Sequence, residues 1–312
     1  MGRQTVEKYQ RLQKETQEAY RLLLGEYRER VGSTGAIPDD SLSRQLDLLE
    51  RAMLEFPPLH EEKDQNGKPT GLWLPRAKGL LGPEYNLRTP PPRRPFSKAQ
   101  GGEFEVIPTS RWAEYIGGED SVDMRDFVLD GMVLDQDGVG SCASEGMTGC
   151  IMASRVKAGQ EPVKLNPWFA YYEVSGGIDQ GSTLSDNVAF ALEKGVPSQT
   201  VWGRDEGWRS KPSAEAFEDA KKHRLLEYWN IDDWTEFGTA CILGLTVYFG
   251  YSGHAIWASK VLDARRLEYC NSWSTDWGDN GFGTLEKSRV QWGYGTYAFR
   301  SVTEASASKE AA

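Results

Sequence analysis

Cys142 stands where a glycine-broken loop gives way to a helical pattern, in the stretch DQDGVGSCASEG (135–146). A cysteine attacks as its thiolate, and the N-terminal end of a helix stabilises a negative charge. Glycines permit a tight backbone in the loop, and Ser141 is of a residue type that caps helices. Position alone leaves two interpretations of Cys142, a nucleophile and a small buried hydrophobic residue, and the second is the commoner in proteins.

A nucleophilic thiol needs a base, and the chain has three histidines, His60, His223 and His254. His60 lies in a segment rich in charge, glycine and proline, and His223 lies in the charged run DAKKHR. His254 stands between two apolar, strand-like runs, where one ring nitrogen can face a thiol and the other an orienting group. A core histidine with satisfied hydrogen bonds is the alternative interpretation of His254.

The run CNSWSTDWGDNGFG (270–283) supplies a candidate for the orienting group. The amide oxygen of Asn271 can accept the imidazole N–H and thereby fix the tautomer and the orientation of the ring. Trp273 can cover that hydrogen bond and exclude water from it. Taken singly, Asn271 is an ordinary turn residue and Trp273 an ordinary core aromatic. Taken with Cys142 and His254, they indicate a Cys-His-Asn site for acyl transfer, which needs neither a metal nor an organic cofactor.

The elements that must position these residues follow from periodicity. Helical patterns recur near 142–158, 184–194 and 213–222, and strand-like runs follow at 241–250, 254–262 and 266–273. Helices first and strands later predict an α+β domain instead of an alternating parallel α/β fold.

Four segments divide the chain. Two amphipathic stripes within residues 1–58 predict a helical hairpin appendage, or alternatively a coiled coil that binds a protein partner. Residues 59–104 are rich in glycine, proline and charge, and they predict a linker or an extended arm. The apolar and aromatic density rises in residues 105–304, which we predict to be the catalytic domain, and residues 305–312 are predicted to be a disordered tail.

The composition excludes several classes of protein. The formal net charge is −10, and the basic clusters in the sequence are short. Both observations argue against a nucleic-acid partner. No apolar run is long enough to span a membrane, and the N-terminal residues lack the apolar core of a secretory signal. We therefore expect a location in the cytoplasm or within an assembly. The four cysteines include no C-x-x-C pair, which argues against a zinc ribbon, a thioredoxin-like site and a disulfide scaffold.

With these motifs in hand, the sequence resembles the papain-like (C1) cysteine peptidases, especially their bacterial and viral members. The resemblance covers roughly residues 110–300. Its motifs occur in the family's order: VDMRDF…GMVLDQDGVGSCA, LNPWFAYYE, DQGSTLSDNVAFALEKGV, GHAI and NSWSTDWGDNGFG. The resemblance implies a two-lobed domain, with a helical lobe followed by an antiparallel β lobe, that cleaves protein or peptide substrates.

The resemblance also assigns roles. It implies that Gln136 and the backbone N–H of Cys142 form the oxyanion hole. It places Gly181 and Ser182 in the segment that hydrogen-bonds the extended backbone of the substrate, and Gly253 beside the scissile bond. These three residues are therefore the expected substrate-binding positions.

Three positions depart from the family pattern. Val139 stands where many members have a disulfide cysteine, Ala143 replaces the aromatic residue after the nucleophile, and Ser274 replaces the glycine of NSWG. The chain between Cys142 and His254 is also short for the family. We expect a more open cleft and an unusual specificity.

Three functions are consistent with the sequence. We favour an active cysteine endopeptidase over a catalytically weak or inert papain-like domain that serves as a structural component of a larger, for instance viral, assembly. A transpeptidase or amidase on the same fold is the third. Residues 1–104 have the layout of a family propeptide, two helices and an extended arm, but lack its helix pattern, so a docking appendage is the alternative. A zymogen would cleave itself near 95–115.

Overall fold

The computed structural model describes residues 60–63, 69–73, 79–118 and 121–300, and the chain divides into two compact units, Met1–Arg76 and Ala77–Ala312. In the first unit, strands β1 (His60–Lys63) and β2 (Pro69–Trp73) pair in antiparallel fashion. The helical hairpin predicted for residues 1–58 and the tail predicted for residues 305–312 lie outside the described residues.

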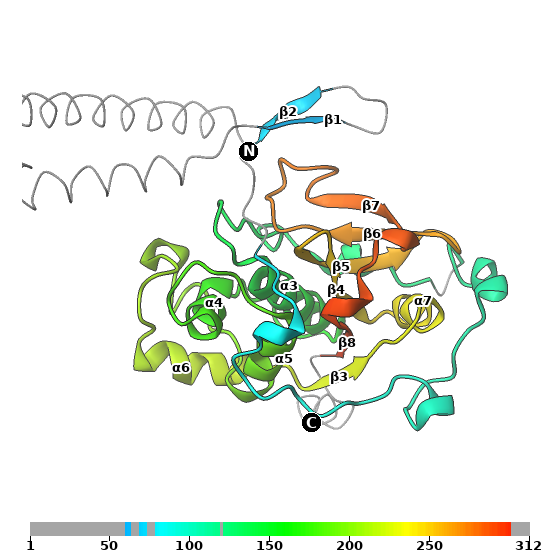
Figure 1. Ribbon diagram of the computed structural model, residues 1–312, viewed down its shortest axis with the longest axis horizontal. Helices are drawn as coiled ribbons and strands as arrows, with labels where there is room; N and C mark the ends of the chain where they lie inside the picture. Colours follow the sequence, from blue (N-terminus) through cyan, green and yellow to red (C-terminus); the bar gives the residue numbers. More distant parts are fainter. Residues whose placement is uncertain (1–59, 64–68, 74–78, 119–120, 301–312) are drawn as a thin grey trace, which may run out of the picture. The chain divides into compact units, whose positions relative to one another are not determined.

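The second unit contains a group of helices and a sheet. Figure 1 shows α3 to α6 gathered beside a sheet, with α7 on the far side of the strands. Their bounds are α3 Cys142–Lys157, α4 Pro167–Ser175, α5 Leu184–Glu193, α6 Ala214–Ala220 and α7 Trp234–Ile242. Within the described part of the chain, none of the helices combines the length and apolar character needed to cross a membrane.

A six-stranded sheet follows, in the order β3-β8-β4-β5-β6-β7, with every neighbouring pair antiparallel. The strands are β3 Glu227–Asn230, β4 Thr246–Tyr251, β5 His254–Val261, β6 Arg266–Cys270, β7 Phe282–Glu286 and β8 Thr296–Arg300. The predicted α+β architecture, a helical lobe followed by an antiparallel sheet, is confirmed.

The central strands are buried on both faces. Successive side chains of a strand point to opposite faces of its sheet. In β5, Ala255 and Trp257 join the core around α3, whereas Ile256 and Ala258 join a second core with Phe237 of α7. This double burial explains why the strands appear in the sequence as nearly continuous apolar runs.

One predicted strand is partly helical. Cys241 and Ile242 end helix α7, and β4 begins only at Thr246. The helix starts where the side chain of Asp233 accepts hydrogen bonds from the backbone of the next turn, 2.7 and 2.9 Å long. Gly244, at a φ of 72°, then turns the chain into the strand. The apolar run alone could not separate the two elements.

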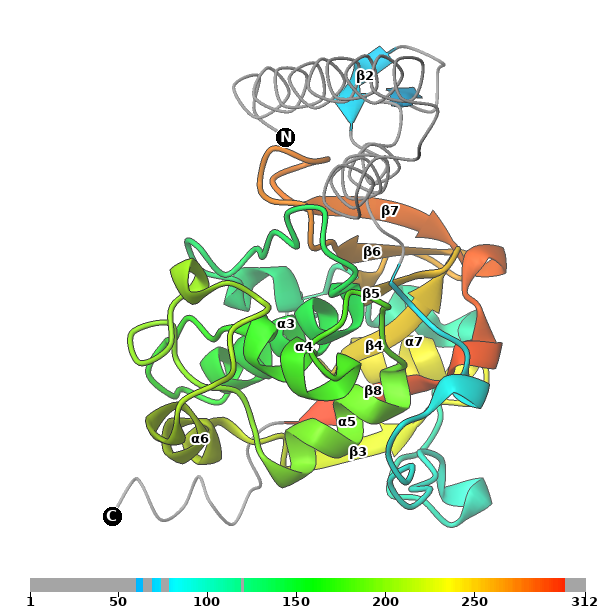
Figure 2. The same ribbon diagram turned by 60° about the vertical axis from the view of Figure 1, so that its left-hand side comes forward.

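The second compact unit extends further toward the N-terminus than the boundary predicted near residue 105. The second unit begins at Ala77, and residues 79–104 are packed into it. Phe96 is fully buried, stacks on Phe104 with ring centroids 4.5 Å apart, and shares its core with Trp229. Figure 2 shows this segment, drawn in cyan, along the side of the unit. Three aromatic residues in a Pro- and Gly-rich stretch give too weak a periodic signal to predict this.

Candidate active site

Cys142 is the first residue of α3 and is fully buried. The preceding loop reaches the helix through Gly138, whose φ of 80° lies in the left-handed region. Ser141 occupies the N-cap position as predicted, but its hydroxyl donates to Glu145 Oε1 at 3.1 Å and accepts no cap hydrogen bond. The nucleophile candidate therefore stands at the positive end of the central helix.

His254 and Asn271 come from neighbouring strands of the sheet. His254 begins β5, Asn271 directly follows β6, and the pairing of these strands places Trp257 opposite Cys270. His254 Nε2 lies 2.8 Å from Asn271 Oδ1, and both side chains are buried. Because an amide oxygen only accepts, this geometry assigns the hydrogen to Nε2 of the ring.

Trp273 covers the histidine. Its ring stacks on that of His254, with centroids 4.8 Å apart and 26° between the planes. Its indole Nε1 donates to Gln136 Oε1 at 3.1 Å. The same side chain thus contacts the candidate base and the candidate oxyanion residue.

Gln136 is held by its oxygen. Oε1 accepts from Ser272 Oγ at 2.8 Å as well as from Trp273, while Nε2 donates to Val139 O at 2.7 Å. The side chain is fully buried, and the backbone N–H of Gln136 donates to Ser272 O at 3.0 Å. With the oxygen fixed, Nε2 is the donor that can address a developing oxyanion.

Three backbone groups connect Cys142 to the rest of the site. The Cys142 thiolate would be stabilised by backbone groups of Ala255, Ala143 and Gly79. Ala255 is the residue after His254, so α3 and β5 meet at the thiol. Burial nevertheless dominates and raises the pKa of Cys142 to about 11.

The expected substrate-binding positions are occupied by the chain itself. Ser182 N donates to Gly79 O at 2.8 Å, Leu81 N donates to Ser182 O at 3.1 Å, and Leu80 N donates to Gly253 O at 3.3 Å. A Cβ on Gly181 would lie 2.3 Å from Gly79 O, so only glycine permits this approach. Residues 79–81, called the cleft segment below, thus contact all three predicted positions.

The sequence did not identify the cleft segment. Its signal is GLLG, an apolar pair between glycines inside a polar stretch, and local composition cannot say where such a pair binds. Leu80 is nevertheless buried, and a Cβ on Gly250 would lie 2.9 Å from its Cδ2. Ser272, which holds Gln136, was also missed as a separate contributor, although it lies within the motif NSW.

The three departures have structural counterparts. Val139 is buried, and all four cysteines are free thiols. Ala143 is buried, and its carbonyl accepts from Tyr248 Oη at 2.7 Å. Ser274 has a φ of 60°, in the region that favours the glycine of the family pattern, and its Oγ accepts from Asp276 N at 3.2 Å. The open cleft expected from these departures stays a prediction.

No protein-family model matches the chain, and no curated protein matches it either. Solved structures do match. Xylellain, a cysteine protease from Xylella fastidiosa, has a TM-score of 0.52 at 16% identity, over 73% of this chain and 98% of its own. Digestive procathepsin L 3 of Tenebrio molitor larval midgut has 0.53 at 12%, over 89% and 99%.

The Amb a 11 cysteine protease of ragweed pollen, in its proform, has a TM-score of 0.52 at 14% identity, over 90% of this chain and 93% of its own. At these identities the likeness concerns the fold. The match extends over nearly the full length of each of these proteins. The chain therefore has the papain-like fold of the cysteine proteases.

Proposed function

We propose that the chain is a cysteine endopeptidase that hydrolyses peptide bonds through a thioester on Cys142. The observation that carries this proposal is the 2.8 Å contact between His254 Nε2 and Asn271 Oδ1, buried beneath Trp273 at the strand that meets the thiol. An imidazole oriented in this way has its other nitrogen, Nδ1, on the opposite edge of the ring, and in the proposed reaction Nδ1 accepts the thiol proton.

In the proposed reaction, the Cys142 thiol transfers its proton to His254 and attacks the substrate carbonyl. The oxyanion is stabilised by the backbone N–H of Cys142 and by Gln136 Nε2. His254 then gives the proton to the leaving amine, and a thioester remains on Cys142. Water, deprotonated by His254, hydrolyses the thioester and restores the thiol.

Substitution of Cys142 tests this function. Cys142→Ala should abolish peptide hydrolysis and labelling by a peptidyl epoxide, while Cys150→Ala, at another buried cysteine of α3, should retain both. Turnover that survives Cys142→Ala would contradict the proposal. Labelling of Cys142 without any peptide hydrolysis would favour the catalytically weak interaction domain.

We further propose that the cleft segment inhibits the enzyme. Its backbone uses the hydrogen-bonding groups of Ser182 and Gly253 that a substrate would need, and Leu80 fills an apolar site beside Gly250 and Tyr294. The same site would accept a leucine-sized side chain of a substrate. Removing a segment of this kind uncovers the thiol, so the intact chain should be the less active form.

A charge at Leu80 tests the inhibitory role. Leu80→Glu would place a carboxylate in a buried apolar site, which costs several kcal/mol unless the segment leaves. We expect at least a tenfold faster Cys142 labelling and hydrolysis than in the parent chain. Leu87→Glu, at a leucine that is 66% exposed, is the matched control and should change neither rate. Equal rates in all three chains would contradict the inhibitory role.

A further inference from the structure

A buried carboxylate lies one turn after the nucleophile. Glu145 is on α3, and its side chain is 0% exposed. Oε1 accepts from Ser141 Oγ at 3.1 Å and from Arg204 Nη1 at 3.0 Å. Burial raises the pKa of Glu145, and the charge of Arg204 opposes that rise. A buried carboxylate is costly without such a partner, so Glu145 and Arg204 form a unit.

The position of Arg204 is fixed by its surroundings. Its guanidinium lies over the ring of Trp168, with 3.7 Å between Cζ and the ring centroid. Asn166 is fully buried and caps α4 by accepting from Trp168 N at 3.1 Å. Its Nδ2 also donates to the carbonyls of Trp202 and Gly203, at 3.0 Å each. Asn166 therefore fixes both the ring and the loop that carries Arg204.

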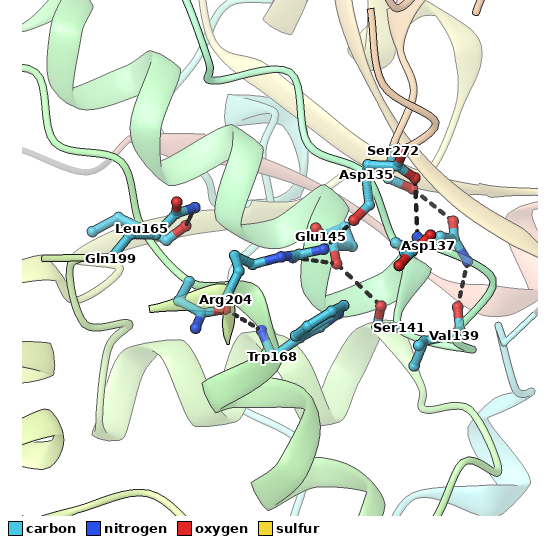
Figure 3. Close-up of polar contacts among 12 residues, drawn as sticks. Asp135, Asp137, Val139, Ser141, Glu145, Leu165, Trp168, Gln199, Arg204 and Ser272 are labelled. Atoms are coloured by element: carbon cyan, nitrogen blue, oxygen red, sulfur yellow. Dashed lines mark hydrogen bonds and ion pairs between the residues drawn. The ribbon is translucent and has the colours of Figure 1, made fainter. Parts of the chain in front are cut away.

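The second arm of the guanidinium reaches the loop that carries Gln136, residues 134–140. Arg204 Nη2 donates to the carbonyl of Asp135, the residue before Gln136. On the other side, the β lobe holds this loop, because Gln136 N donates to Ser272 O and Ser274 N donates to Leu134 O, both at 3.0 Å. The loop is thus held between the sheet and the helical lobe, and Arg204 is its contact with the helical lobe at Asp135. Figure 3 shows Arg204 extended between Trp168, Glu145 and Asp135.

We propose that Arg204 is a positioning residue for the oxyanion hole. Through Glu145 and Ser141 it is bonded to the first turn of α3, which supplies the Cys142 N–H, and through Asp135 it is bonded to the loop that supplies Gln136. The planar guanidinium makes both contacts at once and so sets the separation of the two donors. The catalytic consequence of this inference rests on the proposed function. The contact by which Arg204 holds the loop does not depend on that function.

Arg204→Lys is the informative substitution. An ammonium group retains the charge opposite Glu145 but does not reproduce the two-armed geometry of a guanidinium. In the full-length chain, we expect the amides of Gln136 and Val139 to exchange hydrogen several-fold faster. In the full-length Leu80→Glu chain, we expect kcat for a peptide substrate to fall about tenfold with KM within twofold, the size typical of one weakened oxyanion contact.

The alkylation rate of Cys142 distinguishes an effect on the oxyanion hole from a general disturbance of the structure around the thiol. Iodoacetamide alkylates a thiol without forming an oxyanion, so its rate on Cys142 should be unchanged by Arg204→Lys. Arg209→Lys, five residues along the same loop, where the guanidinium lies over Trp208, is the matched control and should leave all three measurements unchanged. If Arg204→Lys folds poorly, Glu145→Gln serves as the second variant. It keeps the side-chain volume and should show the same faster exchange.

Each outcome decides the inference. Unchanged exchange in both variants overturns it, and faster exchange with unchanged kcat overturns the assignment to the oxyanion hole. An equal fall of kcat and alkylation overturns it too, because the helix terminus itself would then be disturbed. If the parent chains show no Cys142-dependent hydrolysis, the proposed function fails, while the exchange measurement still decides whether Arg204 holds the loop.

Discussion

At the scale of single residues, the candidate site contains opposing influences on one thiol. The helix terminus and the backbone amides of Ala143 and Ala255 favour the thiolate, whereas burial favours the neutral thiol and prevails. The position of Cys142 at a helix start predicts the first influence, and its alternative interpretation as a small buried residue agrees with the second. The grouping of Cys142, His254 and Asn271 could be proposed from the sequence because the chain has three histidines and because the motifs occur in the family's order. The catalytic roles of the three residues stay a prediction.

The raised pKa of Cys142, about 11, makes a prediction about pH. A raised thiol pKa means that the neutral form predominates at pH 7 and that the thiolate fraction grows about tenfold per pH unit below the pKa. Alkylation of Cys142 by iodoacetamide in the intact chain should therefore accelerate about tenfold per unit between pH 7 and 10. Mass spectrometry of the alkylated peptide measures the rate. A plateau already at pH 7 would contradict the prediction.

Asn271 makes a second prediction at this scale. Asn271→Ala removes the acceptor that lies 2.8 Å from His254 Nε2, leaving a buried imidazole N–H without that partner. A loss of about 1–3 kcal/mol is typical of such a deletion, so kcat should fall by about 5- to 150-fold. Steady-state kinetics in the Leu80→Glu background would measure it. Asn280→Gly, at an exposed turn residue with a φ of 54°, is the control, and a comparable loss there would argue against an orienting role.

At the scale of elements, segments with strong periodicity could be predicted from the sequence, and segments with weak periodicity could not. Helix α3 and strands β5 and β6 have long apolar patterns, and they lie where the sequence placed them. The arm at 79–104 has short aromatic and apolar segments separated by prolines. Its position is fixed by contacts with the sheet and with α5, such as those of Phe96 with the core around Trp229 and of Leu87 N with Asp186. Tertiary contacts of this kind leave no local pattern to detect.

The packing of the arm changes the expected position of self-cleavage. Tyr85 is 58% exposed and Leu87 66% exposed, whereas Phe96 is 0% exposed. A protease needs an extended, accessible segment, so processing should fall within residues 82–91 and not near 95–115. N-terminal sequencing and intact mass of the incubated chain locate the cut, with Cys142→Ala as the uncleaved reference. A new N-terminus within 95–104 would contradict this assignment.

At the scale of the whole unit, the sheet separates two hydrophobic cores. One contains α3, α4 and α5, and the other contains α7 together with Phe96 and Phe104 of the arm. The candidate site residues lie at the start of α3, at the start of β5 and directly after the end of β6. Residues near 96–104 thus pack into the unit that contains the candidate site, in a stretch for which the sequence predicts a linker or an extended arm.

Phe96 provides the test of that assignment. Because its side chain is fully buried against Phe104 and Trp229, Phe96→Ala should lower the free energy of unfolding by about 3–5 kcal/mol, the range for truncating a core phenylalanine. Chemical denaturation of the full-length chain measures this loss. Tyr85→Ala, at an exposed ring of the same arm, should change the free energy of unfolding by less than about 0.5 kcal/mol. Equal stabilities of the two variants would mean that the arm is an appendage. The expected difference would make the second half of the arm a permanent part of the unit. Any processing must then leave this half in place.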